Sequence, residues 1–463
     1  MIHSNCRFGA LLWILALSLF AVRGAEAQAT TSVVGIVSDS TGAVLPGVTV
    51  TLTNEDTGIK LQTRTNADGS FRFDTVPAGR YSVTAVVEGF AQQQRKLQVV
   101  VGGAASVNFV FGPAQPPPKG KNYVDMKVFY ATDRKPSGDK APAAFYSGER
   151  SPDGGLGLGT CKVSIPRDHR IGELESPKWW RLQFRQNPNR DVVLLAVIPY
   201  SESKFYSELA SDVKATKEKK AFVFVHGFDV TFEDAARRTA QLAYDLKFQG
   251  VPIFYSWPSK GELAGYPADE ATIEWVRPHL KQFLEELASR SNATSIYLVA
   301  HSMGNRALTG ALQDIASQAR TNPVPHFREV VLAAPDIDAG VFRELAVSIE
   351  TAADRVTLYA SSKDEALAAS KKFHDYARAG ESGPNLIVVN GMDTVDVTAI
   401  DTSFLGHSYV ADNVSVITDI YGLLAGTPAA HRICLSAANL ASLIYWLYGP
   451  PGIAGCPVPL PAP

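Results

Sequence analysis

The sequence predicts a two-domain protein in which a small antiparallel β-sandwich precedes a larger α/β domain with a mostly parallel sheet covered by helices. A chain of 463 residues is too long for a single hydrophobic core. Residues 31–112 are dense in turn signals and short β runs, whereas strands alternate with helical patterns over residues 124–430. Between them, residues 113–121 contain three consecutive prolines, which are typical of a stiff, extended linker.

Composition and charge narrow the function classes. The chain is 46% hydrophobic and 19% charged, as expected of a globular protein, and its formal net charge is -2. This balance gives no basic field for nucleic acid or for an anionic membrane surface, so we expect no nucleic-acid partner.

The N-terminus has the pattern of a secretory signal peptide over residues 1–27. Arg7 supplies the positive charge, Gly9–Val22 is a short apolar run, and Ala25-Glu26-Ala27 is an A-x-A cleavage site. Cleavage after Ala27 predicts a periplasmic or secreted protein with no membrane span; the alternative is an uncleaved N-terminal anchor.

Export would permit disulfides, and four cysteines are present. Cys434 and Cys456 lie in the C-terminal tail, residues 431–463, and a disulfide between them is slightly favoured over free thiols. Cys161 lies inside a strand pattern and is expected to be a buried free thiol. In the same tail, Leu435–Leu447 is predicted as an amphipathic helix that packs on the core.

The strands of the first domain are separated by turns such as Asn66–Gly69 and Pro77–Gly79. The stretches GIVSDSTGAVLPGVTVTLTN, TNADGSFRF and VPAGRYSVTA resemble a carboxypeptidase regulatory-like domain. The resemblance implies a transthyretin-like β-sandwich without catalytic residues, added to exported bacterial proteins, and we expect a cell-envelope or carbohydrate partner for it. The predicted strands are Val33–Val37, Val48–Leu52, Phe71–Phe73, Tyr81–Val87 and Leu97–Val101.

The second domain is predicted to begin with antiparallel strands and to continue as a parallel sheet, because most later strands are unbroken apolar runs. Its predicted strands are Met126–Tyr130, Cys161–Ile165, Val192–Ile198, Ala221–Val225, Ile253–Ser256, Ser295–Val299, Glu329–Ala333, Arg355–Tyr359 and Leu386–Val389. Its predicted helices are Phe232–Phe248, Asp269–Ser289, Met303–Ser317, Ala339–Glu350 and Glu365–Lys372.

One turn in this domain carries the strongest chemical signal. The apolar run before Ala300-His301-Ser302-Met303-Gly304 stops there and a helical pattern follows at once. Small residues two before and two after Ser302 allow a sharp turn that lifts its hydroxyl out of the backbone. Ser302 is therefore a candidate nucleophile, although Ala300 stands where glycine is usual and an ordinary strand–helix turn is the alternative.

The strand FVFV ends in His226-Gly227-Phe228. The backbone N–H of Phe228, together with that of Met303, would form an oxyanion hole for a carbonyl attacked by Ser302. His226 itself is interpreted as a structural loop residue rather than a base.

A serine nucleophile needs a histidine base and an acid that orients it. His407 follows the last strong strand in FLGHSY, where the base is expected in the chain order Ser, acid, His. Asp364 follows the strand Val356–Ala360 and is the favoured acid, although it could simply cap the next helix. Asp336, after the preceding strand, is the alternative acid or a residue that shapes the pocket.

The second domain also resembles the α/β-hydrolases of unknown function of the esterase/lipase-superfamily type. The resemblance is carried by VFYATDR, GTCKVSIP, VFVHGF, FYSWPSKG, VAHSMGNR, AAPDID, YASSKDEAL and GHSYV. It implies an α/β-hydrolase fold and a Ser302–Asp364–His407 triad, but no particular substrate.

The expected activity is hydrolysis of a small-molecule carboxylic ester through an acyl-enzyme, with no metal or organic cofactor. Tyr255, Trp257 and Tyr266 are candidates for the walls of an apolar pocket or for plain packing. Hydrolysis of amides or peptides is one alternative. A catalytically weak envelope-binding or assembly protein on the same scaffold is another.

Overall fold

The computed structural model describes residues 30–40, 42–55, 57, 59–87, 93–100, 105–111, 121–177, 185–260, 265–318, 325–400 and 413–449. The chain divides into two compact units, residues 1–121 and 122–463. The predicted signal peptide and most of the predicted linker lie outside the described residues. Within them, no helix is long and apolar enough to cross a membrane.

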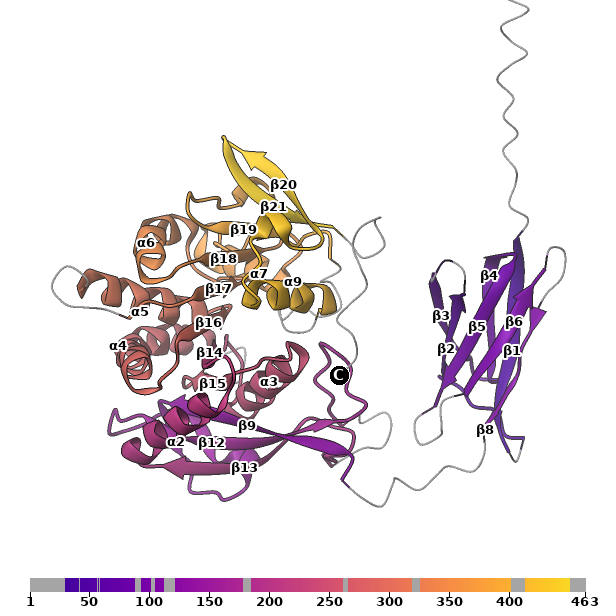
Figure 1. The fold of residues 1–463 in the computed structure, drawn as a ribbon, viewed down its shortest axis with the longest axis horizontal. Coiled ribbons are helices and arrows are strands. Elements are labelled where there is room, and N and C mark those ends of the chain that lie inside the picture. The colour runs from indigo at the N-terminus through magenta and orange to yellow at the C-terminus, as the bar shows by residue number, and fades with distance from the viewer. Residues whose placement is uncertain are drawn as a thin grey trace, which may run out of the picture. The chain divides into compact units, whose positions relative to one another are not determined.

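The first unit is the predicted β-sandwich, antiparallel except that β1 pairs parallel with β7 and β8 (Figure 1). One sheet has the strand order β3-β2-β5-β6, and in the other β1 pairs with β4, β7 and β8. Alternate side chains from both sheets, among them Val33, Val50, Phe71 and Val83, form the core. The strands are β1 (Thr30–Asp39), β2 (Thr49–Asn54), β3 (Lys60–Arg64), β4 (Ser70–Pro77), β5 (Gly79–Val86), β6 (Gln93–Val99), β7 (Ala105–Ser106) and β8 (Phe109–Phe111).

The second unit is built on one eleven-stranded sheet with the order β13-β12-β9-β15-β14-β16-β17-β18-β19-β21-β20. The first three strands of this sheet in chain order, β9 (Tyr123–Thr132), β12 (Gly157–Pro166) and β13 (Val193–Tyr200), pair antiparallel, as predicted. From β9 to β21 every neighbouring pair is parallel. The parallel strands are β14 (Lys220–Val225), β15 (Val251–Ser256), β16 (Ser295–His301), β17 (Glu329–Ala333), β18 (Val356–Ala360) and β19 (Asp393–Asp396).

Helices cover both faces of this sheet. Four of them, α2 (Glu202–Ala215), α4 (Tyr266–Arg290), α5 (Gly304–Gln318) and α6 (Ala339–Ala352), pack their apolar side chains on one face. The other face is covered by α3 (Phe232–Asp245) and α9 (Val414–Leu424) (Figure 1). The helix α7 (Glu365–His374) follows β18, and β10 (Arg134–Pro136) and β11 (Tyr146–Arg150) form a separate hairpin.

Two predictions about the C-terminal part of the chain are wrong. Leu386–Val389 is not a strand; it follows a 3₁₀ turn at Gly383–Asn385, and the strand that pairs with β18 is β19, seven residues further on. The tail residues predicted as a helix form a hairpin of β20 (Leu435–Leu440) and β21 (Leu443–Tyr448), and β21 extends the central sheet by pairing with β19.

The helix prediction failed because the turn of this hairpin has an unusual sequence. Its turn residues, Ala441 and Ser442, have φ of 48° and 73°, the backbone of a two-residue primed turn that glycine or asparagine usually occupies. Because neither glycine nor asparagine stands at these two positions, the sequence gives no clear signal for the turn. Trp446 then fixes the hairpin to the sheet, because its indole N–H donates to Asp393 at 3.0 Å.

Candidate active site

Ser302 lies at the apex of a strained turn between β16 and α5. Its φ is 52°, in the left-handed region that residues other than glycine rarely adopt, and only 4% of its surface is exposed. The Ser302 N–H donates to the carbonyl of Ala333 at 3.0 Å. The side-chain amide of Asn305 donates to the carbonyls of Ser302 and Ala333, at 2.9 and 3.0 Å. These bonds hold the turn at Ser302 in a conformation that costs energy to maintain.

The glycines around this turn are required by close approach. A Cβ on Gly304 would lie 2.3 Å from the carbonyl oxygen of His226, and a Cβ on Gly227 would lie 2.8 Å from the Cβ of Ser302. At the third small position, Ala300 is fully buried with its methyl group in place. Alanine in place of the usual first glycine therefore leaves the turn intact.

The two amides predicted for the oxyanion hole flank this turn. Phe228 belongs to the loop after β14, and Met303 directly follows Ser302. Within the described part of the chain, neither backbone N–H donates to another group. The side chain of Met303 is fully buried in the core beneath α4 and α5. Two such donors beside a serine are the arrangement that stabilises a developing oxyanion.

Buried polar groups fix the loop that carries Phe228. The Asp229 N–H donates to Ser259 Oγ at 3.0 Å, and Ser259 Oγ donates to the buried carboxylate of Asp269 at 2.7 Å. The fully buried guanidinium of Arg134 donates to the Val230 carbonyl at 2.6 Å. Burial lowers the pKa of Arg134 to about 9, although the charges of nearby Asp269 and Asp234 raise it. This loop is therefore anchored at the two residues that follow Phe228.

Asp364, the favoured acid, follows β18 and begins α7. Its Oδ1 accepts the backbone N–H of Leu367 at 3.0 Å, so it is the N-cap of the helix, the role that the sequence left open beside catalysis. The side chain is 3% exposed. The proposed base, His407, lies outside the described residues, in the segment between β19 and α9.

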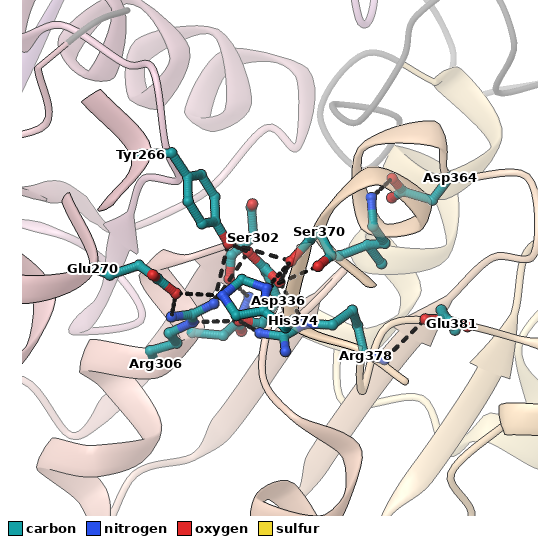
Figure 2. Close-up of polar contacts among 12 residues, drawn as sticks. Tyr266, Glu270, Ser302, Arg306, Asp336, Asp364, Ser370, His374, Arg378 and Glu381 are labelled. Atoms are coloured by element: carbon teal, nitrogen blue, oxygen red, sulfur yellow. Dashed lines mark hydrogen bonds and ion pairs between the residues drawn. The ribbon is translucent and has the colours of Figure 1, made fainter. Parts of the chain in front are cut away.

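Asp336, the alternative acid, sits at the centre of a buried polar network beside Ser302 (Figure 2). Oδ1 of Asp336 accepts from Arg378 Nε at 2.7 Å and from Ser370 Oγ at 2.6 Å, and Oδ2 accepts from the Tyr266 hydroxyl at 2.6 Å. Burial raises the pKa of Asp336, but the charges of Arg306 and Arg378 outweigh it, so the pKa lies below its usual value. Both carboxylate oxygens are already engaged by the network.

The network reaches the turn at Ser302 through backbone and arginine contacts. The Asp336 N–H donates to the Ser302 carbonyl at 3.3 Å, and Arg306 Nε donates to the Asp336 carbonyl at 2.6 Å. Arg306 Nη1 also donates to Glu270 at 2.6 Å. His374 contacts Glu270 through Nε2 at 2.7 Å and the Ser370 carbonyl through Nδ1 at 2.8 Å, so both ring nitrogens are engaged within the network.

Sequence reasoning did not find this network. Glu270, Arg306, Ser370, His374 and Arg378 come from three separate segments, and their hydrogen bonds depend on the tertiary fold. Only Arg306 carries a local signal, because it lies four residues after Ser302 and one helical turn places it on the same side of α5.

The three aromatic residues considered for the pocket lie in different surroundings. Tyr255 is fully buried and its hydroxyl donates to the Asp133 carboxylate. Trp257 is fully buried, stacks on His226 with ring centroids 5.1 Å apart, and donates to the His226 carbonyl at 2.7 Å. Tyr266 is half-buried between the Asp336 network and Phe228, whose ring centroid is 5.1 Å away.

A cavity of about 350 Å³ lies on the opposite face of the sheet from Tyr255 and Trp257, and neither residue lines it. The loop Gly227–Val230 and His301 form one end of it. Apolar side chains of the sheet, α3 and α9 form most of the remainder, together with Leu174, His226 and the charged Asp234 and Arg238 of α3. Its lining includes Phe222, Phe224, Leu242, Leu246, Val299, Ala333, Ile420 and Leu424.

The parallel sheet with helices on both faces and the strained serine turn after a central strand define an α/β-hydrolase. Residues 201–424 match the family model of an alpha/beta hydrolase of unknown function (DUF900), and residues 32–112 match the carboxypeptidase regulatory-like domain. The chain therefore carries an alpha/beta hydrolase domain of this family, preceded by a carboxypeptidase regulatory-like domain. No curated protein gives a significant match.

Solved structures resemble short parts of the chain. The 5-hydroxyisourate hydrolase of Klebsiella pneumoniae is 30% identical over 18% of this chain and 85% of its own, with a TM-score of 0.15. The 3-chlorocatechol 1,2-dioxygenase of Rhodococcus opacus 1CP is 16% identical over 19% of this chain and 62% of its own, with a TM-score of 0.17.

Proposed function

We propose that this protein is a serine hydrolase of carboxylic esters. One observation carries the proposal: Ser302 occupies a strained turn with φ of 52°, flanked by the amides of Phe228 and Met303, which have no acceptor in the described part of the chain. Strain of this kind persists only where surrounding bonds hold it, and it is concentrated at catalytic turns.

The order of the proposed triad agrees with the order of strands. Ser302 follows β16, Asp364 follows β18, and His407 follows β19, which is the neighbour of β18 in the sheet. Because these strands are parallel, their carboxyl ends lie at one edge of the sheet, where open α/β sheets build their sites.

In the proposed reaction, His407 accepts the hydroxyl proton of Ser302 while Oγ attacks the ester carbonyl carbon. The N–H groups of Phe228 and Met303 stabilise the oxyanion of the tetrahedral intermediate. The intermediate collapses by expelling the alcohol, which takes the proton from His407, and leaves an acyl-enzyme. Water, deprotonated by His407, then releases the acid, and Asp364 orients the imidazole throughout.

Hydrolysis of p-nitrophenyl acetate tests this proposal. We expect the wild-type protein to release p-nitrophenol and Ser302→Ala to lose at least about 10⁴-fold in kcat. Ser362→Ala is a matched control, because Ser362 is exposed near the start of α7, and its activity should equal that of the wild type. Folded wild-type protein that releases no p-nitrophenol would instead favour the binding or assembly alternative.

We further propose that the protein is exported, with cleavage after Ala27. Cys434 is disulfide-bonded, with its partner outside the described residues, and disulfides persist mainly in oxidising compartments. The predicted partner is Cys456. Mass measurement of the protein purified from its host should give a chain that begins at Gln28 and gains about 2 Da on reduction. A chain that retains Met1, or no mass change on reduction, would contradict export.

A further inference from the structure

We infer that the cavity between the central sheet, α3 and α9 receives the acyl chain of the ester that Ser302 hydrolyses. The inference rests on the proposed function and adds the substrate class, an ester of a medium-chain fatty acid. The cavity has about 350 Å³, within the usual range of ligand pockets.

Much of the cavity wall is made of apolar side chains, although His226, Asp234 and Arg238 also line the cavity. The apolar part includes Leu242 of α3, Leu246 at the C-cap of α3, and Ile420 and Leu424 of α9. Phe222, Phe224 and Val299 of the sheet form the floor. A polar ligand in this region would lose its hydrogen bonds to water, whereas an alkyl chain gains free energy with each methylene group that it buries.

The outer end of the cavity lies at the oxyanion loop. Gly227, Phe228 and Asp229 line it, and because Asp229 is exposed we place the mouth of the cavity at this loop. His301, the residue before the nucleophile, lines it as well. A carbonyl held by the Phe228 amide would therefore have the mouth of the cavity beside it.

Gly227 connects this mouth with the nucleophile. A Cβ at this position would lie 2.8 Å from Ser302 Cβ and 3.0 Å from His301 Nδ1, so any other residue would fill the space between the turn and the cavity. On the opposite side of Ser302 lies the polar network of Asp336 and Arg306, which offers no apolar surface of comparable extent. The acyl chain is thus the part of the substrate that fits the cavity.

The volume sets the chain length. A water molecule takes about 30 Å³ in the liquid, and a methylene group is of similar size, so the cavity holds on the order of ten carbons. We expect kcat/KM for p-nitrophenyl esters to rise from acetate toward decanoate. Each buried methylene group should raise it by up to about fourfold, which corresponds to about 0.8 kcal/mol per CH₂. Palmitate should be a poorer substrate than decanoate.

The test compares kcat/KM for p-nitrophenyl decanoate with that for the acetate. In Leu246→Trp the indole should fill the cavity, and the decanoate-to-acetate ratio should fall at least tenfold. Val347→Trp adds the same side chain on α6, where Val347 is 68% exposed, and should keep the wild-type ratio. Leu242→Phe is a smaller filling variant should Leu246→Trp fail to fold. An unchanged ratio in a folded filling variant would overturn the inference.

A binding measurement separates this inference from the proposed function. Decanoate should bind to Ser302→Ala in calorimetry, and the filling substitution added to that variant should abolish binding. Absence of decanoate binding overturns the inference even if acetate is hydrolysed. Binding without hydrolysis of any ester by the wild type would leave an apolar-chain site and overturn the proposed hydrolase function instead.

Discussion

Asp336 and Asp364 follow neighbouring parallel strands at the same edge of the sheet. They are equally buried, because only 3% of the surface of each residue is exposed. Their partners differ. Asp336 is bound by two arginines, a tyrosine and a serine, whereas Asp364 is the N-cap of α7 and accepts the backbone N–H of Leu367.

Burial and position at a strand end therefore do not by themselves define a catalytic acid. A carboxylate that already neutralises two guanidinium groups is a structural counter-ion, because moving it toward an imidazole would leave buried charges unpaired. Asp336 therefore fits the role of shaping the site around Ser302, and Asp364 remains our proposed partner of His407.

The largest expected effect comes from Asp364→Asn. Asparagine caps a helix about as well as aspartate, so the melting temperature should change little. The amide cannot stabilise the imidazolium and favours the wrong tautomer, so kcat for ester hydrolysis should fall on the order of 10⁴-fold. Full activity in this variant would contradict the assignment of Asp364 and reopen the choice of acid.

Asp336→Asn should instead act mainly on stability. The substitution removes the carboxylate that faces Arg378, which is only 3% exposed, and one of the two carboxylates that face Arg306. This loss should cost about 3–5 kcal/mol of unfolding free energy. Urea denaturation measures this loss. Asp338→Asn is the control, because Asp338 caps α6 and asparagine preserves a cap. Equal, small losses in both variants would contradict the counter-ion role.

A third aspartate, Asp245, also contacts a buried histidine, and this contact is structural. His169 lies between Asp245, at 2.8 Å, and Glu175, at 2.7 Å. Burial lowers the pKa of His169, but its hydrogen bonds to the two carboxylates outweigh this and raise the pKa to about 9. A histidine held in this way stays protonated at neutral pH and could not act as a base there.

This pair predicts a pH dependence of stability. The folded pKa is above the unfolded value of about 6.5, so the stabilisation is fully present below pH 6.5 and is lost as the pH rises to about 9. The loss should be roughly 3 kcal/mol, from a shift of about 2.5 units. Urea denaturation between pH 6 and pH 9.5 measures it, and the dependence should flatten in His169→Gln. A stability that rises over this interval would be inconsistent with the pair.

Most of the fold could be predicted from the sequence, because the buried parallel strands are continuous apolar runs and the helices between them are amphipathic. The turn at Ser302 was also readable, since it needs small residues at fixed positions. The helices α2 and α9 were not predicted, and neither was the hairpin of β20 and β21, whose primed turn uses Ala441 and Ser442. Its strands are stabilised by pairing with a distant strand rather than by local sequence.

The site was predictable only where its residues lie next to the strands that carry them. Ser302, Phe228 and Met303 could be found from local motifs, and Cys161 is a buried free thiol as predicted. The Asp336 network and the cavity could not be found, because the network forms where α4, α5 and α7 meet and the cavity forms between the sheet, α3 and α9. Local sequence patterns do not predict which side chains from distant segments of the chain come into contact.

The most direct test of the central claim is to identify the residue that a fluorophosphonate probe modifies. Such probes form a covalent adduct with an activated serine, so peptide mapping of the labelled protein should place the adduct on Ser302, and Ser302→Ala should remain unlabelled. An adduct on another residue, or no adduct on correctly folded wild-type protein, would contradict the assignment of Ser302 as the nucleophile.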